Sequence, residues 1–500
     1  MLKRLGWLGE RLAFGVGALF SLVIAVLGAY NGLRGGGYGV FFALGLLGMG
    51  ALTWAGIRFL KPWKAFPIAL FTLRFAIALG VILIFGAVPV QDFQTMYDAA
   101  CQIARGSREY LQTDYFYNWA YQTGFSAYEA LVIKVFGEGI LPLQILNALW
   151  MAGTGCLVWA IARRFLPETT AMAISLLYAL YPAPYFLAAV LTNQHIAVFF
   201  YYLGIWLLVW GKGKSLPRAA LAGVCISLGN VMRPLGVVVI LALLCCALVR
   251  MLLRRGHGVL WLGAPFLAAA VAYFISGEVF DWLIRATGLN PEGLKNNLPL
   301  WKFVLGFNLE TGGAWSRSDY EAYYLLPRGE APGAMEQVVR ERLSSLGLLG
   351  FGELFWKKLQ TMWGAPEYLY WGFGHLNGDA RVLGGLTLNQ CLTAWNYFDR
   401  GMFVLAFGLG AFAQVRWLVK GESSPLRLPL LLSFLVCGYC GVHLLIEVQS
   451  RYRYFLMPAV FLLAGAGAQV LWDLWRRRRE PGDSEPEKSP EEEPVRSPLT

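Results

Sequence analysis

Long apolar runs alternate with short polar segments along most of the chain. Each run holds roughly 17 to 25 residues, which as an α-helix is long enough to cross the hydrocarbon core of a bilayer. The pattern predicts an all-α, polytopic membrane protein. We expect about twelve membrane-spanning helices, near residues 12–30, 38–58, 66–88, 139–160, 169–188, 193–210, 216–232, 235–250, 258–276, 398–419, 426–446 and 454–474.

Composition and charge support this fold class and add a topology. Of the 500 residues, 57% are hydrophobic and 15% are charged, so little sequence remains for a soluble core. Basic residues follow every second apolar run, as Lys61 and Arg163 do, and arginines 476–479 follow the last run. Basic residues mark cytoplasmic ends, so we expect both termini in the cytoplasm and the protein in the plasma (inner) membrane. The net charge of +11 reflects this topology and does not indicate a nucleic-acid partner.

One apolar stretch does not fit a simple alternation. Residues 346–363, LGLLGFGELFWKKLQTMW, include Glu353, Lys357 and Lys358 among their apolar positions. A thirteenth crossing here would also move arginines 476–479 to the outer side, against the charge rule. We therefore interpret the stretch as an amphipathic helix that lies in the outer interface.

The chain is expected to comprise five regions. They are two extra N-terminal spans (1–65), a membrane core (66–276) with a first outer loop (89–137), an outer cap (277–396) with the interfacial helix, C-terminal spans (397–479), and an acidic, proline-rich cytoplasmic tail (480–500). The composition of the tail cannot bury a core, so we expect it to be disordered.

The first outer loop begins with a candidate catalytic residue. The segment VPVQDFQTMYDAACQIARG, residues 88–106, follows the third apolar run and should emerge at the outer membrane surface. Asp92 would lie where a lipid headgroup and a water-borne hydroxyl can both reach it. A carboxylate in that place can accept the proton of such a hydroxyl, which indicates chemistry on lipid-linked substrates.

Further polar residues fall in the first outer loop or at the outer ends of predicted spans. Ionisable groups at membrane depth are costly, so they usually pair with one another or line a pathway. Several of them on one side of the membrane indicate a substrate-binding site. The candidates are Asp98, Arg105, Asn193, Gln194, His195, Arg233, Glu447, Arg451, Tyr452 and Arg453.

Many of these candidates also have a structural interpretation. Asp92 could cap the helix that begins beside it, and Arg233, which precedes a proline, could cap its own helix end. Arg451 and Arg453 could extend to lipid headgroups, and His195 could be a packing residue. These alternatives stay open at the level of the sequence.

Aromatic residues crowd the second half of the first outer loop. Tyr115, Tyr117, Trp119 and Tyr121 alternate along a short stretch. We interpret them as an interfacial aromatic belt, with stacking on a sugar as the alternative.

Motifs for common cofactors are not found in the sequence. No HExxH motif, Walker loop or Rossmann glycine pattern at a strand-to-helix turn occurs, so neither zinc chemistry nor a soluble nucleotide donor is indicated. We assign no metal ligand and no cofactor. A divalent cation is left open, because Asp98 or Glu447 could contribute to holding one.

Several stretches resemble a known family when they are taken in order. The aspartate-containing DFQTMYDAACQIARG is followed by GFSAYEALVIKVFG, LTNQHIAVFFYYLGIWL, NVMRPLGVVVIL and EVQSRYRYFLMPAVFLLAGAG, together reaching from about residue 88 to 467. The last stretch looks like a late RY…P…LLA(G) signature. The set resembles polyprenyl-phosphate-dependent GT-C glycosyltransferases of the family 39 and 83 type. These include protein O-mannosyltransferases and the aminoarabinose transferases of lipid A.

The resemblance implies a GT-C-like bundle and a specific division of labour. Such an enzyme moves a hexosyl or pentosyl group from a polyprenyl-phosphate carrier to a lipid, glycan or protein acceptor on the outer face of the membrane. By match to the loop aspartate of the family, Asp92 would be the general base toward the acceptor hydroxyl. Arg451, with Arg233 and Arg453, would bind the lipid phosphate. The lipid tail would lie between spans, among membrane lipids.

The sequence departs from the family pattern in three places. Residues 193–195, Asn-Gln-His, stand where many relatives carry an acidic residue. Asp92 lies between Gln91 and Phe93, whereas protein O-mannosyltransferases pair the loop aspartate with a neighbouring glutamate. The two spans before residue 66 are an addition to the usual start of the family.

Two other classes of membrane protein remain as alternatives. An envelope-polysaccharide polymerase or ligase is expected to keep its decisive residues in one large late outer loop, here 277–396. A lipid or solute transporter is expected to show related halves and broken helices near the middle of the membrane. The sequence shows no convincing internal repeat, and its charged candidates gather at the outer interface.

Overall fold

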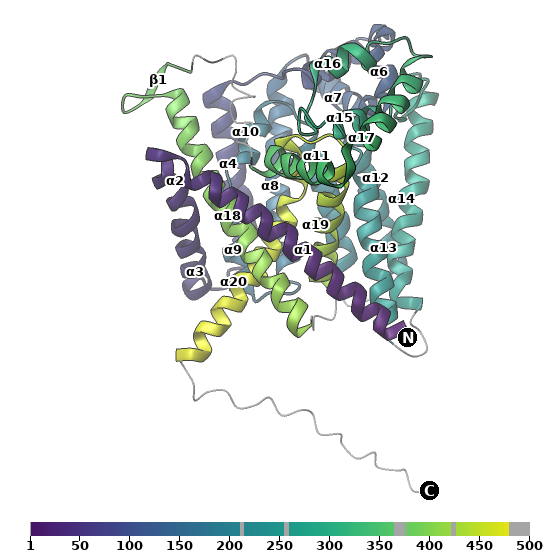
Figure 1. Cartoon of the computed structure of the whole chain (residues 1–500). Coiled ribbons are helices and arrows are strands. Elements are labelled where there is room, and N and C mark those ends of the chain that lie inside the picture. The colour runs from purple at the N-terminus through teal and green to yellow at the C-terminus, as the bar shows by residue number, and fades with distance from the viewer. Residues whose placement is uncertain are drawn as a thin grey trace.

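The computed structural model of the chain describes residues 2–210, 215–254, 260–364, 376, 378–421 and 427–479. The predicted tail at 480–500 lies outside these residues. Within them, the protein is a bundle of helices with a short antiparallel hairpin, β1 (Arg381–Leu383) and β2 (Leu386–Thr387) (Figure 1).

The long helices that build the bundle recur at the predicted places. They are α1 (Leu2–Leu33), α2 (Gly39–Ala43), α3 (Met49–Phe59), α4 (Phe66–Phe85), α8 (Ile140–Ala162), α9 (Glu168–Leu180), α10 (Ala183–Ala189), α11 (Gln194–Val209), α12 (Leu216–Met232), α13 (Gly236–Leu253), α14 (Leu260–Ala286), α18 (Leu388–Lys420), α19 (Leu428–Leu445) and α20 (Met457–Arg479).

Among the described residues, the membrane spans number nine, or ten if a bent pair is counted, against the prediction of about twelve. In the described part of the chain, nine helices are long and apolar enough to cross a membrane, counting α2 and α3 as one. Helices α9 and α10 pass the same test as a pair, as a broken span or a re-entrant loop, and they bend by 51° where Pro182 interrupts the helical hydrogen bonds. The apolar helices α11 and α12 are shorter, with 16 and 17 residues. Each predicted span thus coincides with a helix or a bent pair, and the all-α polytopic fold is confirmed.

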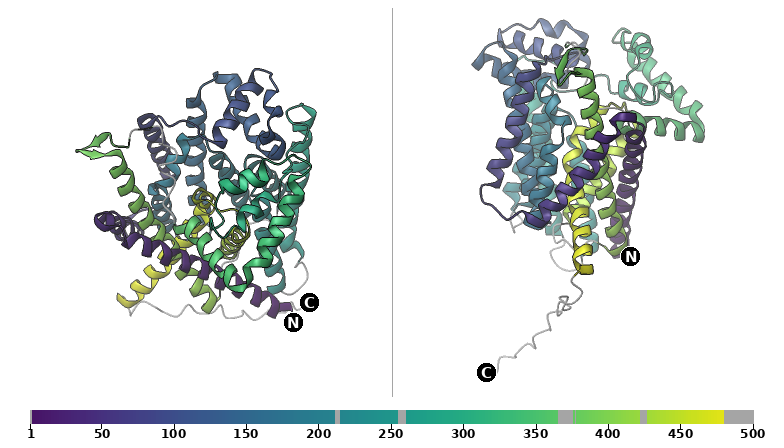
Figure 2. Two further views of the ribbon diagram at one scale, coloured as in Figure 1. Left: turned by 45° about the horizontal axis from the view of Figure 1, so that its top comes forward. Right: turned by 90° about the vertical axis from the view of Figure 1, so that its left-hand side faces the viewer.

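The outer loop and the outer cap are built from shorter helices. They are α5 (Asp92–Ala104), α6 (Asp114–Asn118), α7 (Thr123–Phe136), α15 (Trp301–Gly306), α16 (Arg317–Asp319) and α17 (Ala331–Leu359). Figure 1 shows α6, α7 and α15 to α17 at the end of the bundle opposite to the N-terminus. In the right view of Figure 2, the blue first outer loop and the green outer cap stand on either side of that end. That this end faces outward stays a prediction.

The predicted interfacial helix is the second half of α17. The helix is interrupted at Gly347, which has the left-handed backbone angles φ 55° and ψ −177° that glycine adopts most readily. A π-helical turn, Gln360–Gly364, continues it at the other end. Leu348 and Leu349, directly after the interruption, are 89% and 90% exposed, as expected for side chains that meet lipid.

The two extra N-terminal spans pack against α18. Helix α1 packs along α18, and α2 with α3 packs against α18, α9 and α20. Contact between the second span and α18 depends on two glycines that face each other. A methyl group on Gly45 would lie 2.0 Å from the carbonyl oxygen of Phe398, and one on Gly401 would lie 2.2 Å from that of Phe42. Small residues of this kind let membrane helices approach closely.

Candidate functional site

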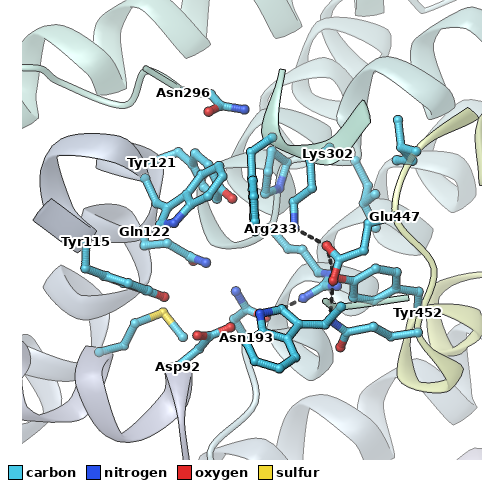
Figure 3. Close-up of a pocket in the computed structure, with 18 of the residues that line it drawn as sticks. Asp92, Tyr115, Tyr121, Gln122, Asn193, Arg233, Asn296, Lys302, Glu447 and Tyr452 are labelled. Atoms are coloured by element: carbon cyan, nitrogen blue, oxygen red, sulfur yellow. Dashed lines mark hydrogen bonds and ion pairs between the residues drawn. The ribbon is translucent and has the colours of Figure 1, made fainter. Parts of the chain in front are cut away.

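A cavity of about 740 Å³ lies at the end of the bundle that is predicted to face outward, and Figure 3 shows residues that line it. Its walls come from parts of the chain that are far apart in sequence, so the fold is needed to assemble it. The lining residues are Asp92, Phe93, Met96, Asp114, Tyr115, Trp119, Tyr121, Gln122, Asn193, Asn230, Val231, Arg233, Pro234, Leu235, Leu294, Asn296, Trp301, Lys302, Trp315, Tyr320, Tyr324, Leu325, Tyr439, His443, Ile446, Glu447, Gln449, Arg451 and Tyr452.

Asp92 is the first residue of α5 and lines this cavity. The preceding residue, Gln91, has φ 50° and ψ −126°, a conformation that is costly for a residue with a side chain. The turn at Gln91 begins α5 and places Asp92 beside the cavity, so Asp92 is not the N-cap of its helix. Its side chain is 51% exposed, and its Oδ2 lies 3.6 Å from Nη2 of Arg451. The carboxylate is therefore accessible to a molecule that enters the cavity.

Two guanidinium groups lie around the ring of Tyr452. Arg451 and Tyr452 belong to a 3-10 helix, Ser450–Phe455, that follows α19. The guanidinium carbon of Arg233 lies 5.1 Å from the centre of the Tyr452 ring, and that of Arg451 lies 5.8 Å from it. Arg451 also donates from Nε to Oε1 of Gln449 at 2.7 Å. Both guanidinium groups line the cavity beside the same ring, and guanidinium groups suit a phosphate, whose oxygens accept their hydrogen bonds.

Arg233 serves the helix end and the cavity together. It is the C-cap of α12, as the structural interpretation of its Arg-Pro sequence suggested, and Pro234 follows it. Its side chain nevertheless reaches the cavity, where Nη1 donates to Oδ1 of Asn193 at 3.2 Å. Asn193 in turn donates from Nδ2 to the carbonyl oxygen of Met232 at 2.9 Å. Asn193 therefore holds the arginine in place without cancelling its charge.

Glu447 forms an ion pair with Lys302 of the outer cap (Figure 3). Tyr452 donates its hydroxyl to the same carboxylate at 3.2 Å, and Gln449 donates to it at 2.6 Å. Burial disfavours the ammonium, but the attraction of Glu447 outweighs burial and raises the pKa of Lys302. Burial likewise disfavours the carboxylate, but Lys302 and the hydrogen bonds outweigh it and lower the pKa of Glu447. Both groups are therefore ionised at neutral pH.

The opposite side of the cavity is aromatic and carries neutral amides. Tyr115, Tyr121, Gln122 and Asn296 are seen on this side in Figure 3, across from Lys302 and Glu447. The predicted aromatic belt is therefore in part a cavity wall, since Tyr115, Trp119 and Tyr121 all line it. Asp92 has the charged side on one flank and this neutral side on the other (Figure 3).

Two of the predicted site residues lie on the outer surface away from the cavity lining. Asp98 is one further turn along α5, where Nε2 of Gln94 donates to its Oδ1 at 2.7 Å. Arg105 ends α5 and forms an exposed ion pair with Glu138. The geometry gives neither of them a role at the cavity.

Three more predicted site residues are buried inside the protein and do not line the cavity. Gln194 and His195 begin α11, and the Nδ1 atom of His195 is hydrogen-bonded to the hydroxyl of Tyr454 at 2.7 Å. Arg453 donates from Nη1 to the carbonyl oxygens of Met362 and Trp363, both at 3.2 Å. For His195 the geometry agrees with the interpretation as a packing residue. Arg453 is buried and donates to π-helical carbonyls, so it does not extend to headgroups.

Lys302 and Asp114 are the charged lining residues that the sequence analysis missed, and Asp114 forms an ion pair with Arg328. The signal for Lys302 is its setting. Lys302 stands within the apolar stretch NLPLWKFVLGF, and a single lysine among such residues is the signal that could have singled it out. Gln122, Asn230 and Asn296 were also missed, and nothing in their local sequence marks them. Among the described residues, no three His, Cys, Asp or Glu side chains are grouped closely enough to hold a metal ion.

Comparison with protein families gives one match. Residues 125–276 match the family described as dolichyl-phosphate-mannose-protein mannosyltransferase. The predicted resemblance to GT-C glycosyltransferases is confirmed over this stretch. The match covers α7 to α14 and includes Asn193 and Arg233, whereas Asp92 and Arg451 lie outside it. Together with the apolar helices, it supports an integral, multi-pass membrane protein that is similar to this family over residues 125–276.

Comparison with solved structures gives weaker similarities. The oligosaccharyltransferase of Archaeoglobus fulgidus in its apo form is 14% identical, with a TM-score of 0.42 over 84% of this chain and 53% of that one. The same archaeal enzyme in complex with an inhibitory peptide and a dolichol-phosphate is 13% identical, with a TM-score of 0.42 over 86% of this chain and 53% of that one. The chain thus spans about half the length of these structures. No curated protein sequence matches it.

Proposed function

We propose that this protein transfers a sugar from a polyprenyl-phosphate carrier to an acceptor hydroxyl, in the cavity at the outer face of the plasma (inner) membrane. The observation that carries the proposal is the position of Asp92. An accessible carboxylate lies 3.6 Å from Arg451, and Arg451 shares the Tyr452 ring with Arg233. This arrangement supports a role for Asp92 as a base beside a site for the donor phosphate.

The reaction assigns one step to each group. Asp92 accepts the proton of the acceptor hydroxyl as its oxygen bonds to the anomeric carbon of the donor sugar. The bond between that carbon and the phosphate oxygen breaks, and the released polyprenyl phosphate gains negative charge. Arg451 and Arg233 stabilise this charge as it develops, because their guanidinium groups already face the cavity. Glu447 positions Lys302 and Tyr452 beside the two arginines.

The proposal is tested by label transfer from a radiolabelled polyprenyl-phosphate sugar to a membrane extract, with purified protein. We expect Asp92→Asn to lower the transfer rate by about 10²- to 10⁴-fold, because the amide cannot accept the proton. Asp98→Asn is the matched control, since Asp98 is an exposed aspartate of the same helix outside the cavity lining. Equal transfer by wild type and Asp92→Asn would remove Asp92 as the base. No transfer from any carrier by folded protein would instead favour a transporter.

A polymerase or ligase of envelope polysaccharides is the second candidate. The observation in its favour is that the outer cap contributes Lys302, Trp301, Tyr320 and Tyr324 to the cavity. The same assay separates the two functions. A polymerase lengthens its labelled product with time, whereas a transferase adds a single sugar to each acceptor site.

A further inference from the structure

The neutral side of the cavity has the composition of a binding site for a carbohydrate. The exposed or half-buried rings that line the cavity include those of Tyr121, Trp315, Tyr320 and Tyr324. These rings combine a flat apolar face with a polar edge, as the two faces and the rim of a sugar ring do. An acyl chain would instead be expected to meet mainly aliphatic side chains.

The rings of Trp315, Tyr320 and Tyr324 contact one another in a row, and Trp119 lies between this row and Tyr121. Tyr320 and Tyr324 are stacked with their centres 4.9 Å apart, and Trp315 continues the row at 6.2 Å from Tyr320. The buried Trp119 lies nearly parallel to Tyr324 and donates from Nε1 to its hydroxyl at 3.1 Å. Because both the outer loop and the outer cap contribute rings, this aromatic layer exists only when the two are docked together.

Two polar atoms beside this layer lack a hydrogen-bond partner among the described residues. They are the hydroxyl oxygen of Tyr115 and Oε1 of Gln122, and both are inaccessible to water. Figure 3 shows both side chains on the neutral side of the cavity, and the hydroxyl of Tyr115 points toward its interior. A buried polar atom without a partner is destabilising, so a ligand hydroxyl that reached either atom through a small shift of its neighbours would form a favourable contact. A phenol and an amide suit the uncharged hydroxyls of a sugar.

The position of Asp92 assigns this side to the acceptor. The base must face the acceptor, while the arginines beyond it face the phosphate of the donor. The neutral side lies on the flank of Asp92 away from Lys302 and Glu447 (Figure 3). We infer that the acceptor is itself a carbohydrate, a glycan or the glycan part of a glycolipid, and that it stacks on the Tyr121–Trp315–Tyr320–Tyr324 layer. This inference rests on the proposed function and names its acceptor class.

The cavity lining offers fewer suitable contacts to a peptide acceptor than to a carbohydrate. Extended peptides are commonly bound by adding a strand to a sheet edge, which supplies main-chain partners. The strands of the described chain, β1 and β2, do not contribute to the cavity lining. The wall offers ring faces and side-chain amides in their place.

The test uses the purified full-length protein with a radiolabelled polyprenyl-phosphate sugar and three acceptors. These are oligosaccharides released from the cell envelope, glycolipids in vesicles, and a peptide that contains serine and threonine. We expect saturable transfer to the oligosaccharides or the glycolipids. Transfer to the peptide alone, or to lipids from which the glycan was removed, would overturn the inference and leave the proposed function standing. Absence of transfer to all acceptors, with the donor intact, would overturn both.

Two variants decide whether the wall binds that acceptor. Trp315→Ala is expected to raise KM for the glycan acceptor about tenfold, with a smaller change in kcat and in KM for the donor. Trp315→Phe should restore most of the affinity. The matched control is Trp356→Ala, because Trp356 is 48% exposed, close to the 53% of Trp315, but does not line the cavity. An equal KM for wild type and Trp315→Ala would overturn the assignment.

The variant Gln122→Met separates a binding role from a structural role, because the two roles predict different changes in unfolding temperature and in KM. Removal of an unpartnered buried oxygen should leave the thermal unfolding temperature equal or higher. We expect KM for the glycan acceptor to rise at the same time by severalfold. A variant that unfolds at lower temperature and keeps the KM of the wild type would show that Gln122 supports the fold alone.

Discussion

Basic residues occur in two kinds of place in this protein. Arg233, Lys302 and Arg451, here called the cavity cations, line the cavity. Their polar partners include side chains, such as Asn193 for Arg233 and Glu447 for Lys302. A substrate oxygen that enters the cavity can approach these cations without disturbing the backbone.

Arg74, Lys358 and Arg453, here called the sealed cations, are nearly inaccessible, with 0%, 1% and 4% exposure. Each of them donates hydrogen bonds to main-chain carbonyl oxygens. Arg74 of α4 donates to Tyr178 at 2.8 Å and lies over its ring, with the guanidinium carbon 4.3 Å from the ring centre. These cations satisfy carbonyls that the fold would otherwise leave without a partner, so they belong to the structure.

The comparison shows what an ionisable residue at membrane depth does and does not indicate. Burying an ionisable side chain is costly, so the side chain needs a polar partner. That partner can be the backbone of the protein itself or a substrate. Accessibility from a cavity distinguishes the two cases. Arg451 and Arg453 show this most directly, because they are two residues apart in one 3-10 helix and yet fall into different classes.

The sharpest test of the comparison is therefore Arg451→Ala beside Arg453→Ala. We expect Arg451→Ala to lower the transfer rate by about 10²- to 10³-fold with little change in stability, because it removes charge stabilisation of the leaving phosphate. Arg453→Ala should lower the free energy of unfolding by about 1–3 kcal/mol, because two buried carbonyls lose their donor. Initial rates and thermal unfolding in detergent measure both. Loss of stability in Arg451→Ala equal to that in Arg453→Ala would break the distinction.

The Lys302–Glu447 pair tests whether a cavity cation also supports the fold. Glu447→Gln is expected to cost about 2–3 kcal/mol, less than the loss of a fully buried pair, because the lysine keeps contact with the cavity. The double variant Lys302→Met/Glu447→Leu should recover much of this stability, since neither charge is left alone. The transfer rate of the double variant should stay low, because the hydroxyl of Tyr452 loses the carboxylate that accepts its hydrogen bond. A double variant with full activity would show that the pair is structural only.

The sequence predicted the spans well because runs of about twenty apolar residues are rare outside membrane-spanning helices. It also predicted that Asp92, Arg233, Glu447 and Arg451 would gather, since all of them follow or precede spans at the same side. Arg453 could not be separated from Arg451, because only the position of the Met362 and Trp363 carbonyls decides between them. The aromatic lining of the cavity could not be predicted from the sequence for a similar reason. Its rings come from the outer loop and the outer cap, whose docking no local pattern records.

The sealed cation Lys358 is expected to give an effect that depends on pH. Its Nζ donates to the carbonyl oxygens of Leu444 and Ile446, at 2.9 and 2.7 Å, at the end of α19. Burial lowers its pKa to about 7. An unfolded lysine titrates at about 10.4, so between these pH values the unfolded chain binds the additional proton. The contribution of Lys358 to stability must therefore increase as the pH rises from about 7 toward 10, and be constant below 7.

We expect Lys358→Met to remove this rise from a plot of thermal stability against pH between 6 and 9. Lys357→Met is the matched control, because the neighbouring Lys357 is partly exposed and pairs with Glu353 at 2.8 Å. Its variant should keep the slope of the wild type. If Lys358→Met keeps it as well, the ammonium does not titrate in this range. Lys358 would then remain charged at the end of α19, as the cavity cations do beside their side-chain partners.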